Sequence, residues 1–288
     1  MRRTRGRRGR RGSRGWRAVV VAAVSVVLAA AAAVPSGAAP ASPLEASGAV
    51  PTVPPAGGDR PTCWFGACYD YVFGRQVTAV QGAAVSMGVA RPRVDPRRAT
   101  EHSLQELSIQ NTGQTATVEV GWTVDRQLNH DTRPHLFVYH WVHGKTSCYN
   151  GCGFVRTSNR VRPGRALRPG STVRLGIRRI RGDWWVLAGG RRIGYFPGSL
   201  WQGTFTSGSI TTAFGEVALA KDDVPSCTAM GNGRFGTAAG SSRISAFTLY
   251  GTSTPPRLSL TSTSPARYNS GHPSARSFTL GGPGKGPC

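Results

Sequence analysis

The sequence is poor in acidic residues, with 13 Asp and Glu among 288 residues against 36 Lys and Arg. It also lacks the Gly-x-Ser-x-Gly, His-Glu-x-x-His and phosphate-binding glycine motifs of the common hydrolases and nucleotide enzymes. These absences argue against an α/β-hydrolase, a zinc peptidase of the HExxH kind and a P-loop enzyme. A Ser-His-Asp triad assembled by folding stays open, because spacing in sequence says nothing about convergence in space.

Lysine is nearly absent, since 33 of the 36 basic residues are Arg. Nucleic-acid binding is typical of basic residues that cluster with stacking aromatic side chains. Here the Arg residues are scattered, apart from the stretch Arg156–Arg181. We therefore expect solvated Arg side chains on the surface and no nucleic-acid partner.

The one long hydrophobic run, Ala18–Val34, follows a segment (residues 2–17) with nine Arg and no acid, and small residues come after it. This succession predicts a signal peptide at residues 1–41. An uncleaved anchor is the alternative, because the run is nearly long enough to span a bilayer. Residues 42–62, rich in Pro, Ala and Gly, are expected to be a linker or short propeptide. We expect a secreted, extracellular protein that meets a membrane only transiently, through its signal peptide.

Cysteines in an oxidising compartment predict disulfides, and the chain has an even set of six. The Asn150-Gly151 turn favours a bond between its flanking cysteines, and the other close pair suggests a second local loop. The expected pairs are Cys148–Cys152, Cys63–Cys68 and Cys227–Cys288. A zinc site from Cys148, Cys152, His140 and His143 is an alternative whose spacing matches no standard pattern. We expect no metal and no cofactor.

Short alternating runs predict an all-β domain over residues 63–251. Residues 117–124 alternate strictly, with Val118, Val120, Trp122 and Val124 on one face. Turn signals separate this run from further expected strands at 135–142, 172–180, 184–187, 192–196, 208–219 and 243–250. The pattern predicts an antiparallel β-sandwich of jelly-roll or lectin-like kind, with disulfides. Residues 252–288, rich in Ser, Thr, Pro and Gly, are expected to be a C-terminal segment tied back by Cys288.

Five glutamates follow the predicted signal peptide, and two of them stand out. Glu119 and Glu216 each lie mid-strand between residues expected to be buried, although carboxylates are rare in strands and costly to bury unpaired. Glu101 and Glu106 flank a mixed polar segment that we interpret as surface. If Glu119 and Glu216 converge, two close carboxylates would hold one proton between them, which suits acid–base attack by water.

Several segments resemble the neprosin family, in the family's order, between about residues 80 and 250. They are Val118-Glu-Val-Gly-Trp-Thr-Val124, Pro134-His-Leu-Phe-Val-Tyr139, Cys148-Tyr-Asn-Gly-Cys-Gly-Phe-Val155, Trp184-Trp-Val, Ile193-Gly-Tyr-Phe-Pro-Gly-Ser-Leu200, Phe214-Gly-Glu-Val217 and Met230-Gly-Asn-Gly-Arg-Phe235. The resemblance implies a secreted glutamic endopeptidase with an antiparallel β-sandwich and a preference for cleaving after proline. Carried over by motif, the two catalytic glutamates are Glu119 and Glu216.

The sequence thus predicts a monomeric peptidase that acts on protein or peptide substrates, proline-rich ones included, without a metal. One glutamate would activate water and the other protonate the leaving amine, with activity on the acid side of neutrality. Two alternatives remain: a non-catalytic sandwich that binds polysaccharide or cell wall, and a glycosidase that uses the same carboxylates. Five aromatic residues could line a cleft or fill the core: Trp122, Tyr139, Trp184, Trp185 and Tyr195.

Overall fold

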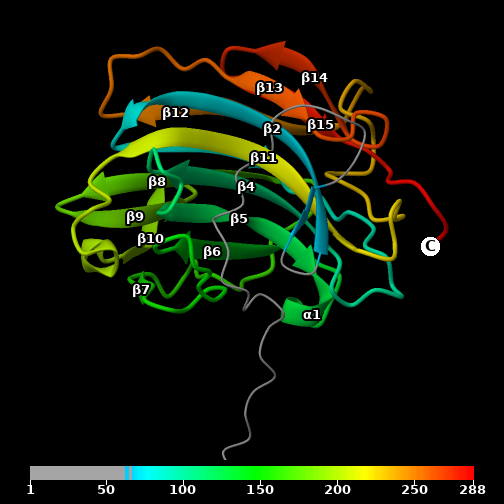
Figure 1. Ribbon diagram of the computed structural model, residues 1–288, viewed down its shortest axis with the longest axis horizontal. Coiled ribbons are helices and arrows are strands. Elements are labelled where there is room, and N and C mark those ends of the chain that lie inside the picture. The colour runs from blue at the N-terminus through cyan, green and yellow to red at the C-terminus, as the bar shows by residue number, and fades with distance from the viewer. Residues whose placement is uncertain (1–61, 65–66) are drawn as a thin grey trace, which may run out of the picture. The chain divides into compact units, whose positions relative to one another are not determined.

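The computed structural model describes residues 62–64 and 67–288 (Figure 1). The described residues all belong to one compact unit. The predicted signal peptide and nearly all of the predicted linker lie outside the described residues.

The first of two antiparallel sheets has seven strands in the order β1-β2-β11-β4-β5-β6, with β13 also paired to β2. Its long central strands β11 and β4 hydrogen-bond to neighbours on both sides, so the middle of the sheet has no free edge. The strands are β1 (Thr62–Trp64), β2 (Ala67–Val80), β4 (His102–Gln110), β5 (Thr117–Asp125), β6 (His135–Trp141), β11 (Gly208–Ala220) and β13 (Ser259–Ser262).

The second sheet has eight strands in the order β14-β15-β12-β3-β8-β9-β10-β7. They are β3 (Gly82–Gly88), β7 (Val155–Arg156), β8 (Thr172–Ile180), β9 (Asp183–Ala188), β10 (Arg191–Phe196), β12 (Ser242–Tyr250), β14 (Asn269–Ser274) and β15 (Ser277–Gly281). Two four-residue helices, α1 (Arg126–Asn129) and η1 (Gly198–Trp201), complete the described elements. In residues 62–64 and 67–288 no helix has the length and apolar character needed to cross a membrane.

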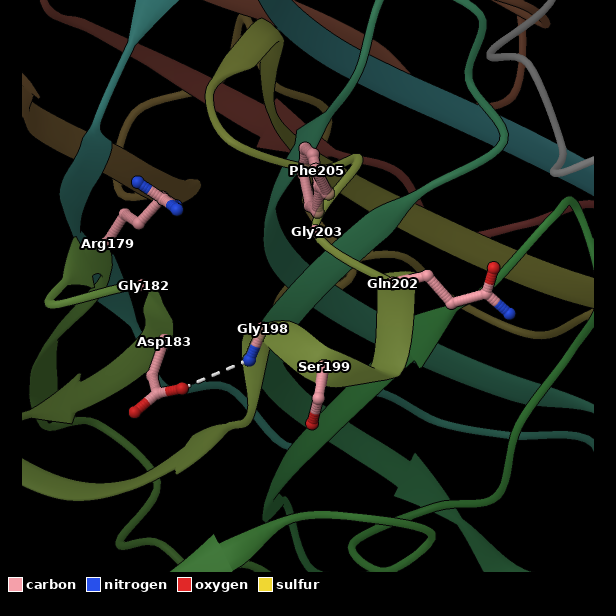
Figure 2. A pocket seen from close by; sticks show the side chains of 8 residues that line it. All are labelled: Arg179, Gly182, Asp183, Gly198, Ser199, Gln202, Gly203 and Phe205. Carbon is pink, nitrogen blue, oxygen red and sulfur yellow. Dashed lines mark hydrogen bonds between the residues drawn. The ribbon is translucent and has the colours of Figure 1, made fainter.

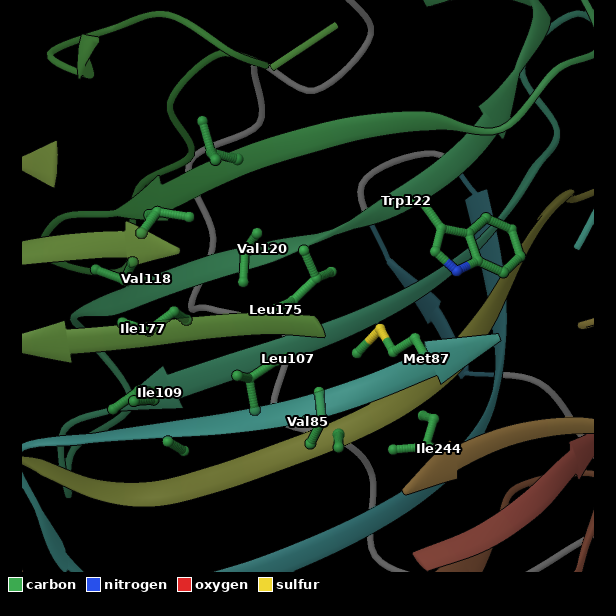
Figure 3. Packing of buried hydrophobic residues seen from close by; sticks show 14 of the residues in the cluster. Val85, Met87, Leu107, Ile109, Val118, Val120, Trp122, Leu175, Ile177 and Ile244 are labelled. Carbon is green, nitrogen blue, oxygen red and sulfur yellow. The ribbon is translucent and has the colours of Figure 1, made fainter. Parts of the chain in front are cut away.

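The main core lies between the two sheets and confirms the predicted alternation in β5. Val118, Val120 and Trp122 are fully buried and pack toward Leu175 and Ile177 of β8 (Figure 3). Successive strand residues point to opposite faces, so alternate apolar residues can fill one layer. Each fully buried aliphatic side chain stabilises the fold by about 1.5–3 kcal/mol. The expected antiparallel β-sandwich is confirmed.

The described cysteines form three disulfides, Cys63–Cys68, Cys148–Cys152 and Cys227–Cys288, in the pairs that the spacing favoured. The bond between Cys227 and Cys288 ties the end of the chain to the loop after β11. The C-terminal segment does more than return to the domain, because it supplies β13 to the first sheet and β14 and β15 to the second (Figure 1).

Candidate active site

The two glutamates singled out from the sequence lie on the same face of the first sheet. Glu216 of β11 is opposite Leu104 of β4, which is opposite Thr123 of β5, and Glu119 is an even number of residues from Thr123. Directly opposed residues of an antiparallel pair share a face, as do alternate residues along a strand. We call this side of the sheet, turned away from the core between the sheets, the carboxylate face.

A third glutamate of the carboxylate face lies between these two. Glu106 of β4 is opposite Phe214 of β11 on one side and Gly121 of β5 on the other. Strand spacing and rise put its Cα about 8 Å from that of each outer glutamate. That Glu119 and Glu216 share one proton stays a prediction, and the Cα of a third glutamate lies near the midpoint between theirs.

Glu106 and Glu101 were both expected at the surface, and both expectations are wrong. Glu106 is only 4% exposed, and its Oε1 has no hydrogen-bond partner. Glu101 is fully buried and accepts hydrogen bonds from the Ser226 and Thr228 hydroxyls and the Ala220 amide, which connect β4 to the loop after β11. The polar residues around them suggested solvent, but segments distant in sequence cover this part of the sheet.

Aromatic side chains surround the three glutamates on the carboxylate face. They form a second apolar cluster, separate from the core between the sheets, in which the Tyr149 ring packs 5.2 Å from Tyr139 and 5.3 Å from Phe137. The cluster lowers the local dielectric around the carboxylates and so strengthens the electrostatic interactions among them. Its buried members are Tyr69, Tyr71, Phe73, Leu104, Phe137, Tyr139, Trp141, Phe214 and Ala218.

The Cys148–Cys152 loop holds Tyr149 over this face. The Asn150 amide donates to the carbonyl of Val138, and Asn150 Oδ1 accepts from the amide of Val138, so the loop binds to β6. The Tyr139 hydroxyl also donates to the carbonyl of Ser147. With Cys148 and Cys152 joined in a disulfide, the alternative zinc site has lost two of its four ligands.

The surroundings of Glu119 raise the pKa of its carboxyl. Trp141 Nε1 donates a hydrogen bond to Glu119 Oε1 at 2.8 Å. Burial and the negative charge of Glu216 nevertheless raise the pKa of Glu119 to about 8, against the lowering effect of the Trp141 hydrogen bond. A carboxyl with this pKa is protonated at acid and neutral pH and can donate a proton.

The Glu216 carboxyl lies beside polar side chains. His102 Nε2 lies 3.2 Å from Glu216 Oε1, and His102 Nδ1 lies 3.7 Å from Asp125 Oδ2. Burial lowers the pKa of His102, but the hydrogen bond to Glu216 and the charges of Asp125 and Glu216 outweigh burial and raise it. Tyr71 also hydrogen-bonds Glu216. A ring nitrogen of His102 and the Tyr71 hydroxyl therefore both lie against the Glu216 carboxyl.

The series of side-chain contacts Asp125–His102–Glu216 follows from local structure. Asp125 ends β5 and caps α1, where its Oδ1 accepts a hydrogen bond from the Leu128 amide at 2.9 Å. That cap leaves Asp125 Oδ2 facing His102, which starts β4 directly opposite Asp125. The contacts of His102 with Asp125 and Glu216 were not predicted from the sequence. A signal was present, since an Asp that ends a strand before a short polar segment is a common N-cap.

Two of the histidines that crowd residues 130–143, His140 and His135, have partners other than the three glutamates. His140 of β6 points to the opposite face, where its ring packs against Phe196 and Trp201 and burial lowers its pKa to about 4. His135 contacts Asp131 and the Gly164 carbonyl. The described residues contain no group of three or more His, Cys, Asp or Glu side chains arranged to hold a metal ion.

The five aromatic residues singled out from the sequence lie in three different parts of the fold. Trp122 and Trp184 are fully buried in the core between the sheets, and Tyr139 lies on the carboxylate face. Trp185 and Tyr195 pair across β9 and β10 of the other sheet, with ring centroids 4.6 Å apart. Only Tyr139 among the five therefore borders the glutamates.

A separate pocket of about 490 Å³ lies between the β8–β9 turn and η1 (Figure 2). Its one carboxylate, Asp183, accepts a hydrogen bond from the Gly198 amide at 3.0 Å. Its lining includes Arg179, Ser199, Gln202 and Phe205 but none of the three glutamates. A single carboxylate already bonded to backbone offers no acid–base pair, so the carboxylate face is the better candidate site.

Comparison with known proteins identifies the family. Residues 99–283 match the family model described as Neprosin. The match covers more than half of the chain, and the chain belongs to the neprosin family. It is accordingly a glutamic-type peptidase, an enzyme class whose substrates are peptides or proteins.

Solved structures show related architecture at low identity. Scytalido-glutamic peptidase with a peptide-based transition state analog is 9% identical, with a TM-score of 0.43 over 74% of this chain and 98% of that one. SCP-B, an eqolisin-family peptidase in complex with the tripeptide Ala-Ile-His, is 10% identical, with a TM-score of 0.41 and the same coverage. A Bacteroides ovatus mixed-linkage glucan hydrolase is 7% identical, with a TM-score of 0.35 over 54% of this chain and 68% of that one. Similarity at this level carries no argument about chemistry.

Proposed function

We propose that the protein is a secreted endopeptidase in which Glu216 activates water and Glu119 protonates the leaving amine. The observation that carries this assignment is the contrast between their surroundings. Glu216 contacts a histidine at 3.2 Å, whereas the pKa of Glu119 rises to about 8 through burial and the charge of Glu216. A buried carboxyl that keeps its proton, beside a second carboxyl with polar partners, is a usual basis of an acid–base assignment.

The mechanism needs no covalent intermediate. Ionised Glu216 takes a proton from a water molecule as the water oxygen attacks the scissile carbonyl carbon. Protonated Glu119 then gives its proton to the nitrogen as the C–N bond breaks. Because both groups lie in a largely apolar environment, their charges act at low local dielectric and with little competition from solvent.

The aromatic side chains that surround the glutamates fit a peptide with an apolar residue next to the cleaved bond. Tyr71, Tyr139 and Tyr149 provide flat, partly polar surfaces, on which a proline ring packs without losing side-chain rotamer entropy. We therefore propose cleavage after proline. We also propose export by the N-terminal signal peptide and action as an extracellular monomer.

The test is cleavage of paired peptides that differ only in Pro or Ala before the scissile bond. We expect the wild type to prefer the proline peptide, and Glu119→Gln and Glu216→Gln each to lose about 10²–10⁴-fold in kcat. Asp222→Asn is the matched control, since that carboxylate is 71% exposed and pairs only with Arg98 among the described ion pairs. Full activity in either glutamine variant would contradict the assignment.

Glucan hydrolysis is the counter-assay for the glycosidase alternative. Release of reducing sugar that disappears in both glutamine variants, with no peptide cleavage, would assign these carboxylates to sugar chemistry instead.

A further inference from the structure

We propose that Glu106 is a third catalytic carboxyl, which stays protonated and donates a hydrogen bond to the carbonyl oxygen of the scissile peptide bond. The inference rests on the proposed function, because it assigns the group that stabilises the charge created when Glu216 and Glu119 act. It also replaces a two-residue site with a row of three carboxyls on β11, β4 and β5.

The position of Glu106 is the first argument. Its Cα lies about 8 Å from each of the outer glutamates, on the strand between theirs. A scissile carbonyl must lie between the water that Glu216 activates and the nitrogen that Glu119 protonates. The group at the midpoint of the row is therefore the one that can reach the carbonyl oxygen.

The neighbours of Glu106 leave its Oε1 without a polar partner. The residues opposite it are Phe214 and Gly121, neither of which has a polar side chain. A Cβ at Gly121 would lie 2.7 Å from the Phe137 ring, so that ring closes over the place where another side chain would stand. Glu106 Oε1 is buried and unpartnered, and such an atom is costly unless a ligand satisfies it.

The charges around Glu106 keep it neutral. Burial, followed by the charges of Glu119 and Glu216, raises its pKa well above the ordinary value. His102 is already engaged by Glu216 and Asp125. By strand register, Arg75 of β2 and His135 of β6 also lie on this face. The tyrosines of this face and of the Cys148–Cys152 loop have raised pKa values and are neutral hydroxyls: Tyr69, Tyr71, Tyr139 and Tyr149.

The chemical step balances with Glu106 as a donor that keeps its proton. A C–O bond forms between the water oxygen and the carbonyl carbon, the water proton goes to Glu216, and the π electrons move to the carbonyl oxygen. The Glu106 O–H stabilises the resulting oxyanion. The C–N bond then breaks and nitrogen takes the proton of Glu119, after which Glu216 and Glu119 regain their starting states by proton exchange with solvent.

Two substitutions test this role in steady-state peptide cleavage. Glu106→Leu removes the donor, and we expect kcat to fall about 10²–10³-fold, as for loss of one oxyanion-hole donor, with KM little changed. Glu106→Gln keeps an N–H donor at the same place, so its kcat should stay within about 10-fold of the wild type. A leucine variant with wild-type kcat, or a glutamine variant as inactive as the leucine variant, would overturn the proposal.

Thermal unfolding separates this role from a structural one. Glu106→Leu removes a buried unpartnered oxygen, so we expect an unfolding temperature equal to or higher than that of the wild type. Gln105→Leu is the matched control: it is the adjacent residue of β4, faces the core between the sheets, and has a buried amide without a partner. We expect unchanged kcat in this control, and a leucine variant of Glu106 that is both unfolded and inactive would contradict the proposal.

Failure of this proposal is distinguishable from failure of the proposed function. If Glu119→Gln and Glu216→Gln are inactive while Glu106→Leu cleaves normally, only the role of Glu106 is refuted. If the variants of Glu119 and Glu216 remain active, both proposals are refuted.

Discussion

The two faces of the seven-stranded sheet have different compositions, although the same strands supply both. On β5, Val118, Val120 and Trp122 point into the core between the sheets, while Glu119 points to the carboxylate face. On β11, Ala213 and Val217 are buried in that core, while Glu216 belongs to the carboxylate face. The period-two geometry of a strand therefore lets neighbouring residues serve stability and chemistry separately.

The carboxylate face is nevertheless not a solvated surface. Its aromatic cluster buries Glu106 and leaves Glu119 and Glu216 partly exposed, and burial on this face raises the pKa of Glu119 and Glu106. The difference between the faces is thus mainly in buried polar groups. A face of this kind lowers stability in exchange for reactive groups.

The largest expected effect separates activity from stability on a single strand. Glu119→Gln should lose about 10²–10⁴-fold in kcat, because Gln has the shape of the acid but no proton to donate. Its unfolding temperature at pH 8 should be unchanged or higher, because a buried ionising group is gone. Peptide cleavage and calorimetry on the same preparation check both. Joint loss of activity and fold would contradict the claim that the two faces of the sheet serve chemistry and stability separately.

A substitution on the other face of β5 should affect stability and not activity. Trp122→Ala should destabilise the protein by about 3–5 kcal/mol, because it leaves a large cavity between the sheets. The folded fraction should retain the catalytic groups and their kcat. Denaturant unfolding measures the loss, and active-site titration of the folded fraction separates it from a chemical defect.

The next effect concerns pH. A carboxyl whose pKa rises from about 4.5 unfolded to about 8 folded binds more protons in the folded state between these values. Stability from this group is therefore fully present below about pH 4.5 and falls as pH rises toward about 8. We expect wild-type unfolding temperatures to fall over this range and Glu119→Gln to flatten the slope; an unchanged slope would contradict the burial of an ionising Glu119.

A smaller effect is expected at His102. His102→Gln removes the imidazole that lies 3.2 Å from Glu216 Oε1, so the proposed base loses a hydrogen-bond partner and kcat should fall about 10-fold. The raised pKa of His102 also means that its own stabilisation is present below its unfolded pKa and is lost as pH rises through its folded pKa. Rate profiles from pH 3 to 9 check the fall, and an unchanged kcat would separate His102 from the base.

The smallest effect should come from the outer face of the second sheet. Trp185 is half-buried and stacks on Tyr195, so Trp185→Ala should cost about 1 kcal/mol of stability. It should leave both kcat and the preference for proline unchanged. A lost proline preference would move the substrate site from the carboxylate face to this sheet.

Most of the fold could be predicted because its strands alternate cleanly or have turn residues at their ends. The expected strands at 117–124, 172–180, 192–196 and 208–219 correspond to β5, β8, β10 and β11. Strand β2 was missed because Asp70, Gly74 and Arg75 interrupt its apolar residues, which are buried on both faces between β11 and β13. Strands β13–β15 were missed because their composition is typical of disordered segments, and pairing with the sheets and the Cys227–Cys288 bond order them.

The sequence by itself determined the antiparallel sandwich, the close cysteine pairs and the two glutamates in the middle of strands. These features depend on local alternation and spacing, which a short stretch of chain already contains. Only the tertiary structure decided that Glu106 lies between Glu119 and Glu216, and that His102 joins Asp125 to Glu216. The register of β4 between β5 and β11 sets these contacts, and the cover from the Cys148–Cys152 loop and β2 sets their burial; both depend on residues far apart in the chain.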